Sequence, residues 1–427
     1  FSVLMLQIQF IRDHTQEVIR RLAIKNFDGA VIITDILSAD DHRKDVQKRL
    51  DDINAESNNL AREIGILFKS GKAAEANTLK EQTASLKIKA KELESEMDAA
   101  RAALDDLLVR VPNLPHSSVP AGKTAEDNEI IHHEGQMPEL GEDAIPHWDL
   151  AAKYDIIDFN LGNKITGAGF PVYKGKGARL QRSLINFFLD KAIEAGYTEI
   201  QPPLAVNAAS GYGTGQLPDK DGQMYYIGQD ELYLIPTAEV PVTNLYRDVI
   251  LKEEDLPVKN VAYSACFRRE AGSYGKDVRG LNRLHQFDKV EIVQIRKAEE
   301  SYTALEEMKQ HVAGLLRLLG IPFRIVRLCG GDMSFTSALT YDFEVWSGAQ
   351  KRWLEVSSVS NFETFQSNRM KLRYKDDTGK IHLTHTLNGS AIALPRVVAA
   401  LLENNQTPDG IMIPEALRTY TGFDKIQ

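Results

Sequence analysis

The chain has 427 residues, enough for two or three domains, and its 43% hydrophobic and 26% charged residues are typical of a soluble globular protein. The net charge of −9 excludes a generally basic surface for nucleic acid, so any contact with a phosphate polymer must be local. Only Cys266 and Cys329 occur and no apolar run reaches the length of a membrane span, which excludes a disulfide framework, a cysteine zinc site and membrane insertion and favours a cytoplasmic protein.

The first hundred residues have mainly helical patterns. Helical spacing predicts a helix from about Ile8 to Lys25, and Val31 to Leu37 resemble a short bridging segment. Two heptad series then flank Ser70-Gly71. At a rise of about 1.5 Å per residue each predicts a helix roughly 45–55 Å long, and together they predict a two-stranded antiparallel coiled-coil arm that projects from the body. The seam positions are Val46, Leu50, Ile53, Ser57, Leu60, Ile64 and Leu67, then Leu79, Thr83, Leu86, Ala90, Leu93, Met97, Ala100, Leu104 and Leu107.

A coiled coil of this kind is most often a spacer or a dimerisation arm. Here the seam is narrow and contains Ser57 and Thr83, so little apolar surface remains for another chain once the hairpin has closed. The outer faces mix acidic residues with lysines, which suits either a solvated helix or a contact with RNA backbone. These lysines are Lys69, Lys72, Lys80, Lys87, Lys89 and Lys91.

The helical arm ends at a proline-rich linker. Because Pro112, Pro115 and Pro120 interrupt helices, we place the domain boundary so that residues 1–112 form the arm and residues 113–427 form a second domain. The adjacent pair His132-His133 has no further metal ligands near it in sequence, and we expect no function for it.

The second domain alternates irregularly between predicted strands and helices. A buried helix is predicted over Gly177–Ala195, and Tyr197–Val206 is predicted to be a strand at a sheet edge because it contains two prolines. Since no regular βαβ alternation appears, we predict an α+β fold with a mainly antiparallel sheet. Further predicted elements are strands in Asp230–Val240, Ile325–Cys329, Tyr341–Trp346 and Trp353–Ser357, and a helix over Glu299–Leu319. His385–Leu394 then lead into a predicted helix over Leu394–Glu403.

The stretch Phe267 to Glu291, FRREAGSYGKDVRGLNRLHQFDKVE, predicts a strand, a long polar loop and a returning strand. Arg268 can place two N–H donors on a phosphate or carboxylate, and Glu270 can accept a hydrogen bond from an exocyclic amine. Phe287 offers a flat apolar face to a base. Each residue alone is more often structural, but together they predict a nucleotide site.

Two later segments suit the phosphate end of ATP. Leu354-Glu355-Val356-Ser357-Ser358 places a carboxylate and hydroxyls at a strand end, and these are hard oxygen ligands of the kind that Mg²⁺ takes. Arg396 begins a helix beside Pro395, where it can pair with a phosphate or be structural. The chain has neither a P-loop, a dinucleotide fingerprint nor a G-x-S-x-G nucleophile elbow, so those nucleotide folds and serine hydrolases are excluded.

The amino-acid sequence of the Phe267–Glu291 stretch resembles motif 2 of the seryl-tRNA synthetases, which are class II aminoacyl-tRNA synthetases. The helix before Gly196 and the strand with Pro202-Pro203 are similar to motif 1, which builds the dimer interface of that class, and the Glu355 and Arg396 segments resemble the metal-ligand segment and motif 3. The resemblance covers essentially the whole chain, because the arm corresponds to the one that grips the long variable arm of the tRNA in this family.

The resemblance implies a role for each matching residue. It assigns Arg268 to the α-phosphate and the substrate carboxylate, Glu270 and Phe287 to adenine, and Arg396 to the γ-phosphate, which makes Arg268 and Arg396 the catalytic pair. Arg269, Val356 and Ser357 complete the expected ATP-binding segments, with no individual role for Arg269, and Glu355 with Ser358 would hold Mg²⁺. The expected serine-binding residues are Thr237, Ala238, Glu239, Arg268, Glu291, Asn388 and Ser390.

The implied activity is ATP-dependent attachment of L-serine to tRNA(Ser) through a seryl-adenylate, with tRNA(Sec) as a further substrate, by a cytoplasmic homodimer without zinc. Two alternatives stay open at this point. Another class II synthetase or a ligase that does not use tRNA would exchange pyrophosphate with a different amino acid. A non-catalytic RNA-binding protein would have lost residues of the nucleotide site, whereas Arg268, Glu270, Phe287 and Arg396 are all present.

Overall fold

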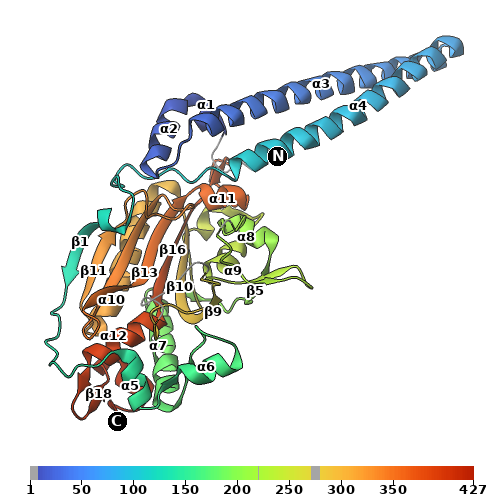
Figure 1. The fold of residues 1–427 in the computed structure, drawn as a ribbon. Helices are drawn as coiled ribbons and strands as arrows, with labels where there is room; N and C mark the ends of the chain where they lie inside the picture. Colours follow the sequence, from blue (N-terminus) through green and yellow to red (C-terminus); the bar gives the residue numbers. More distant parts are fainter. Residues whose placement is uncertain (1–7, 220, 271–278) are drawn as a thin grey trace. The chain divides into compact units, whose positions relative to one another are not determined.

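The computed structural model describes residues 8–219, 221–270 and 279–427, and these form two compact units (Figure 1). The first unit takes the chain up to Ala23 and again Phe27–Pro112, and the second takes Ile24–Asn26 and Asn113–Gln427. In the described parts of the chain, no helix is long and apolar enough to cross a membrane.

The first unit is helical throughout its described length. Two short helices, α1 (Ile8–Asp13) and α2 (Thr15–Ile24), precede α3 (Ala30–Lys69) and α4 (Ala73–Leu108), which lie side by side (Figure 1). The bridging segment predicted over Val31–Leu37 is wrong, because these residues form the first turns of α3. Ile32, Ile33 and Ile36 are buried on one side of that helix, and this spacing fits a helix rather than an extended link.

The α3–α4 pair confirms the predicted coiled coil and its seam. Val46, Leu93 and Met97 are buried and pack with Leu50 and Ile53, as heptad positions on facing helices should. Toward the turn the seam is only half-buried. Gly71 has a φ of +75°, so the reversal uses the left-handed conformation that glycine adopts at least cost.

The second unit is built on an eight-stranded sheet with the strand order β1-β11-β12-β13-β16-β10-β9-β4. All neighbours are antiparallel except β4 and β9, which confirms the predicted mainly antiparallel α+β fold. The strands are β1 (Glu129–Glu134), β4 (Thr198–Glu199), β9 (Val258–Phe267), β10 (Gln286–Arg296), β11 (Phe323–Arg327), β12 (Leu339–Ser347), β13 (Arg352–Glu363) and β16 (His385–Ala393).

The predicted strand over Tyr197–Val206 forms two short strands instead of one. β4 lies at the edge of the large sheet, as its prolines predicted, and β5 (Ala205–Asn207) joins a small separate sheet with β6 (Tyr226–Ile227) and β7 (Leu232–Leu234). Pro202 and Pro203 lie between β4 and β5. Neither proline can donate to a ladder, so the strand is interrupted there.

Helices cover both faces of the large sheet. One face shares the main apolar core with α7 (Gly175–Glu194), α10 (Ser301–Leu318) and α12 (Leu394–Asn404), and Val290 and Ile292 of β10 belong to this core. Because side chains alternate along a strand, Glu291 and Val293 point to the other face. That face meets α9 (Glu239–Asn244) and α11 (Phe365–Arg369), so the polar residues of β10 and β16 lie on it.

The remaining elements are short. The helices are α5 (His147–Lys153), α6 (Phe159–Ile165), α8 (Ala208–Thr214) and α13 (Glu415–Thr421), with 3-10 turns at Ala125–Asp127, Glu253–Asp255 and Ala298–Glu300. The strands are β2 (Ile157–Asp158), β3 (Val172–Tyr173), β8 (Ile250–Lys252), β14 (Arg373–Lys375), β15 (Ile381–Leu383), β17 (Gln406–Thr407), β18 (Gly410–Met412) and β19 (Lys425–Ile426).

Candidate active site

The predicted strand, loop and strand are present as β9 and β10. The two strands pair without a register shift from Val258 opposite Ile295 to Phe267 opposite Gln286. The loop between them includes Ala271 to Val278, with Gly272 and Gly275, which lie outside the described residues.

Arg268 stands at the end of β9 with its guanidinium over the ring of Phe287, 5.2 Å from the ring centroid. Its Nε donates to the carbonyl oxygen of Pro236 at 3.4 Å. The backbone is held as well, because the Arg268 N–H donates to His285 O at 2.9 Å and His285 Nδ1 lies 3.0 Å from Arg268 O. The guanidinium of Arg268 therefore contacts the ring of Phe287, as the sequence predicted.

Glu270 follows in a left-handed backbone conformation, with a φ of +49°. A non-glycine residue adopts this conformation only where its surroundings hold it. Its carboxylate accepts a hydrogen bond from Nε of Arg283, a residue that the sequence had not singled out. Between them, Arg269 donates its backbone N–H to Gln223 O at 2.8 Å and exposes its side chain.

A second group of polar side chains gathers where α9 faces β10 and β16. The strand predicted through Glu239 ends at Leu234, and Glu239 instead begins α9, with its N–H donating to Thr237 Oγ1 at 3.2 Å. Ala238 beside it is fully buried in an apolar contact with Val293. Thus Thr237 and Glu239 are held by a tight turn that the periodicity did not reveal.

The pKa of Glu239 is raised to about 7, first by burial and then by the nearby negative charge of Glu291. Hydrogen bonds from Gln366, at 2.6 Å, and from Asn388 partly offset this rise. Glu239 and Glu291 are therefore two buried carboxylates that lie close together, and the charge of Glu291 opposes the ionisation of Glu239. Such an arrangement suits a ligand that carries a positive charge.

Glu291 is almost fully buried and has two polar partners. Lys289 Nζ lies 2.7 Å from its Oε2, and Ser390 Oγ donates to the same oxygen at 3.3 Å. The register of β10 and β16 explains this contact, because Glu291 is directly opposite Ser390 and Val293 is opposite Asn388. The sheet register thus brings Asn388 and Ser390 to the carboxylates.

The third group lies on β13 and at the start of α12. Arg396 donates from Nη1 to the carbonyl oxygen of Glu355 at 2.8 Å, and Nη1 also lies 3.8 Å from the Glu355 carboxylate. Ser358 Oγ is 3.5 Å from Glu355 Oε1. Of the other two residues in this segment, Ser357 donates to the carbonyl oxygen of Ser390 at 2.6 Å, and the side chain of Val356 is buried in the apolar core.

Asp342 of β12 belongs to this group, although the sequence did not single it out. It is directly opposite Ser358 in the sheet, forms a hydrogen bond with it, and has one buried oxygen, Oδ1, without a partner. Burial, followed by the charge of Glu355, raises the pKa of Asp342 well above its usual range. Carboxylate and hydroxyl oxygens are the ligand types that hard cations prefer, and a buried carboxylate oxygen is normally paired.

The three groups occupy neighbouring strands in the order β13-β16-β10-β9. Ser390 connects two of them, because its hydroxyl donates to Glu291 and its carbonyl accepts from Ser357. The structure therefore places the predicted site residues, which lie between Thr237 and Arg396 in the sequence, on adjacent elements of one domain. Sequence reasoning missed Asp342 and Arg283, and it also missed Lys289 and Gln366. Alternation along the strand with Glu291 could have revealed Lys289, whereas no sequence signal points to Gln366.

Comparisons with known proteins agree with this architecture. The family model of the class II tRNA synthetase core domain (G, H, P, S and T) matches residues 225–405, and that of the seryl-tRNA synthetase N-terminal domain matches residues 5–115. The chain is 51% identical to a serine–tRNA ligase of Salinibacter ruber and 45% identical to that of Akkermansia muciniphila, with 99% of each chain covered.

Solved structures extend the likeness to the fold. The seryl-tRNA synthetase of Pyrococcus horikoshii complexed with ATP superposes with a TM-score of 0.91 at 33% identity over 99% of both chains. The cytoplasmic serine–tRNA ligase of Naegleria fowleri in complex with AMP gives 0.86 at 25% identity over 99% of this chain and 98% of that one. With its arm, its sheet and its full-length relatives taken together, the chain belongs to the seryl-tRNA synthetase family of class II aminoacyl-tRNA synthetases.

Proposed function

We propose that the protein activates L-serine with ATP and transfers the seryl group from the resulting adenylate to tRNA(Ser). The observation that carries this proposal is the junction at Ser390, where the paired carboxylates Glu239 and Glu291 meet the Glu355 segment beside Arg396. The relative from Salinibacter ruber is a serine–tRNA ligase, and the structure from Pyrococcus horikoshii contains ATP. Both support the assignment.

In the activation step, a carboxylate oxygen of serine attacks the α-phosphorus of ATP, and the bond to the departing pyrophosphate breaks. Arg268 would bind both the α-phosphate and the serine carboxylate, and its position over the ring of Phe287 supports this role. Phe287 would stack on the adenine, and Glu270 would accept a hydrogen bond from its amine. Arg396 would pair with the γ-phosphate. Because these groups hold both reactants and neutralise the phosphoryl oxygens, the reaction needs no protein nucleophile.

The third group fits Mg²⁺, since Glu355, Ser358 and the unpaired Oδ1 of Asp342 are all oxygen ligands. Glu355 and Ser358 would hold the ion, with Asp342 behind them. When bound there, the ion supplies positive charge to the phosphate oxygens of ATP. We expect no zinc at this site.

Replacing Glu355 with Gln should weaken the response to Mg²⁺. Because a charged ligand becomes neutral, we expect the Mg²⁺ concentration for half-maximal ATP–pyrophosphate exchange to rise about tenfold, the equivalent of about 1.4 kcal/mol. The measurement is a Mg²⁺ titration at fixed free ATP. Glu254→Gln is the matched control, because Glu254 is exposed and its ion pair, with Lys252, lies on the surface. An unchanged Mg²⁺ midpoint for Glu355→Gln would remove Glu355 from the cation site.

The site would recognise serine by its ammonium group and by its hydroxyl group. Glu291 would hold the ammonium, and Glu239, with Thr237 and Asn388 beside it, would accept the hydroxyl. Ala238 fixes the turn that presents these residues. Alanine would leave these buried groups unpaired, which costs more than a lost contact, whereas threonine must be excluded by lack of space.

Serine binding should depend on pH through Glu239. The pKa of about 7 means that Glu239 is partly protonated near neutrality, and the ammonium of serine favours its ionised form. Binding should therefore release a proton, and the dissociation constant should rise as the pH falls below about 7, by at most about tenfold per unit. Calorimetry in two buffers of different ionisation enthalpy measures both quantities.

The control for this prediction is Glu239→Gln, which keeps the shape of the side chain and removes the titration. This variant should bind serine more weakly but with no pH dependence between about pH 6 and about pH 8. If the unmodified protein took up protons on binding serine, or if the variant kept the full pH dependence, Glu239 would not be the titrating group.

The two domains would have different functions, tRNA binding and catalysis. We propose that residues 1–112 form the arm that grips the tRNA by shape and backbone charge, and that residues 113–427 form the catalytic domain. We also propose a cytoplasmic homodimer that acts on tRNA(Sec) where that tRNA exists. Gel filtration with light scattering, and charging of both tRNAs, test these points.

The direct test of the proposed activity is ATP–pyrophosphate exchange across a panel of amino acids. We expect exchange with serine that exceeds exchange with alanine or glycine by at least about a hundredfold, because a buried hydrogen-bonding site discriminates strongly against analogues that leave it unpaired. Exchange with threonine should also be lower than with serine, because the extra methyl group lacks space. Preference for another amino acid would move the chain to a different ligase activity.

A further inference from the structure

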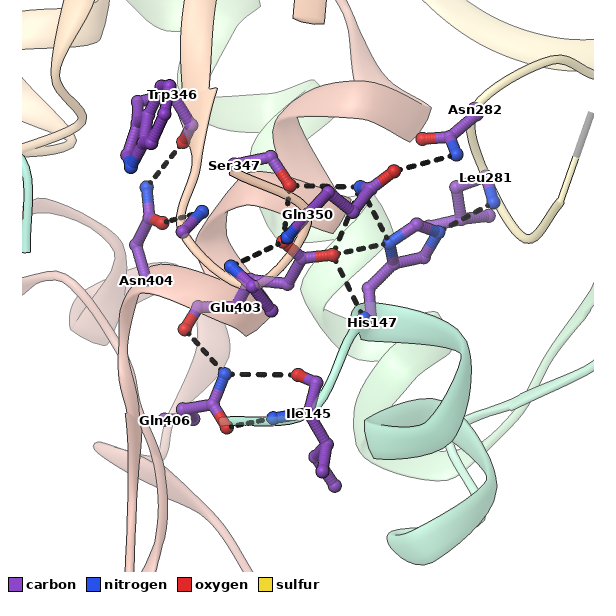
Figure 2. Close-up of polar contacts among 12 residues, drawn as sticks. Ile145, His147, Leu281, Asn282, Trp346, Ser347, Gln350, Glu403, Asn404 and Gln406 are labelled. Atoms are coloured by element: carbon purple, nitrogen blue, oxygen red, sulfur yellow. Dashed lines mark hydrogen bonds and ion pairs between the residues drawn. The ribbon is translucent and has the colours of Figure 1, made fainter. Parts of the chain in front are cut away.

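A buried polar network links four separated segments next to the candidate ATP site (Figure 2). At its centre are His147 of α5 and Glu403 of α12, both fully buried. Glu403 Oε1 accepts from the His147 N–H at 3.0 Å, from His147 Nδ1 at 2.8 Å and from Gln350 Nε2 at 3.1 Å. Its Oε2 accepts from the hydroxyl of Ser347 and from the N–H groups of Ala349 and Gln350.

These donors stabilise the ionised form of Glu403. Burial is the largest influence and raises the pKa of Glu403, but the hydrogen bonds from His147 and Ser347 outweigh it, so the pKa lies below its usual value. A carboxylate that accepts several hydrogen bonds in a dry site is a rigid anchor, because every displacement of a donor exposes a buried charge.

The contacts of His147 fix its tautomer. Its Nε2 accepts a hydrogen bond from the backbone N–H of Leu281 at 2.9 Å, so this nitrogen carries no proton and the ring proton lies on Nδ1, facing Glu403. Gly280 approaches the same ring. A Cβ on this glycine would lie 2.3 Å from His147 Nε2, so the backbone before Leu281 can reach the histidine only with glycine there.

Leu281 and Asn282 lie at the point where the chain enters β10 from the motif 2 loop. The carbonyl oxygen of Asn282 accepts from Arg396 Nε at 2.8 Å, and its side-chain amide donates to Gln350 Oε1 at 2.9 Å. Arg396 and Glu403 lie two turns apart on α12. The loop base is therefore attached to one helix twice, directly through Arg396 and indirectly through His147 and Glu403.

We propose that His147 is a positioning residue for ATP binding, which holds the base of the motif 2 loop so that Asn282 O orients the guanidinium of Arg396. The proposal rests on the proposed function of Arg396. His147 itself touches no substrate. Loss of its bond to Leu281 would free the Asn282 carbonyl to move, and Arg396 would lose the acceptor that holds its Nε while its Nη1 stays on Glu355 O.

Two substitutions separate the two hydrogen bonds of His147. In His147→Asn the amide can replace Nδ1 and still donate to Glu403, but it is too short to reach Leu281. In His147→Gln the longer amide can place its oxygen near the position of Nε2 and accept from Leu281. We expect His147→Asn to raise the KM for ATP in serine-dependent exchange about tenfold, which is the loss expected for one buried hydrogen bond. We expect His147→Gln to raise this KM less than about threefold.

Other readouts separate positioning from folding. The KM for serine should stay within about twofold in both variants, and hydrogen–deuterium exchange of the peptide that contains Leu281 should increase in His147→Asn only. Ser347→Ala, which removes a donor to Glu403 but no contact with the loop, should lower the melting temperature without changing the KM for ATP. Gln350→Ala removes the side-chain hydrogen bond to Asn282 and should raise the KM for ATP about threefold. This variant tests the proposal even if His147→Asn fails to fold.

Equal KM values for ATP in His147→Asn and His147→Gln, or an unchanged value in both His147→Asn and Gln350→Ala, would overturn the proposal while leaving the ligase activity intact. Absence of serine-dependent exchange in the unmodified protein would instead contradict the proposed function. The two failures are therefore distinguishable.

Discussion

Arg268→Ala should reduce serine-dependent ATP–pyrophosphate exchange by about a thousandfold or more. Removing one donor that is aimed at charge developing in a transition state typically costs about a hundredfold to a thousandfold. Arg268 is assigned to two partners, the α-phosphate and the serine carboxylate, and its guanidinium is already held between Phe287 and Pro236. The measurement is kcat/KM for exchange, with ATP and serine each varied.

The neighbouring arginine supplies a matched control. The side chain of Arg269 is exposed and its structural contact runs through the backbone, so Arg269→Ala should keep exchange within about threefold, as a surface substitution does. Arg268→Lys should remain more than about tenfold impaired, because an ammonium cannot form two parallel hydrogen bonds with a carboxylate or phosphate. Similar losses in Arg268→Ala and Arg269→Ala would show that Arg268 has no special place in the reaction.

Shortening the arm should separate the two steps of the reaction. Excision of residues 58–85, with Ser57 and Leu86 joined by a short glycine linker, removes the tip of the α3–α4 hairpin and leaves the buried cluster of Val46, Leu93 and Met97 in place. Exchange should stay within about twofold, and kcat/KM for charging tRNA(Ser) should fall at least about a hundredfold, or about 2.7 kcal/mol of binding.

The matching control is a variant in which exposed lysines of α4, next to the excised segment, are replaced while the hairpin keeps its length. Lys87→Gln with Lys91→Gln should reduce tRNA charging less than the excision does and should make the remaining affinity less sensitive to salt, because fewer backbone phosphates are neutralised. Loss of exchange in the excised protein would contradict the division between a tRNA-binding arm and a catalytic domain.

Local patterns predicted the arm better than they predicted the body of the protein. A heptad seam is readable because each position depends on residues three and four away, so Val46, Leu50 and Ile53 could be identified one by one. The bridging segment predicted over Val31–Leu37 failed because a short β-branched apolar run fits a helix and an extended segment equally well. The strand at Tyr197–Val206 was divided by its prolines, which sequence reasoning used only to place it at an edge.

The candidate site was predictable only where residue types were distinctive. Arg268 with Phe287 could be paired from one hairpin, because antiparallel strands bring their ends together. Asp342 could not be found, since its role depends on the register that places it opposite Ser358 across a sheet. Gln366 reaches Glu239 from a helix 127 residues away in sequence, and only the folded chain reveals that contact.

A crystal structure with a non-hydrolysable seryl-adenylate analogue would show directly where the protein binds adenine, phosphate and serine. We expect the adenine against Phe287, the group that replaces the α-phosphate on the guanidinium of Arg268, and the serine hydroxyl at Glu239. An analogue bound away from the face formed by β9, β10, β16 and β13, or bound there with Arg268 turned from it, would contradict the account.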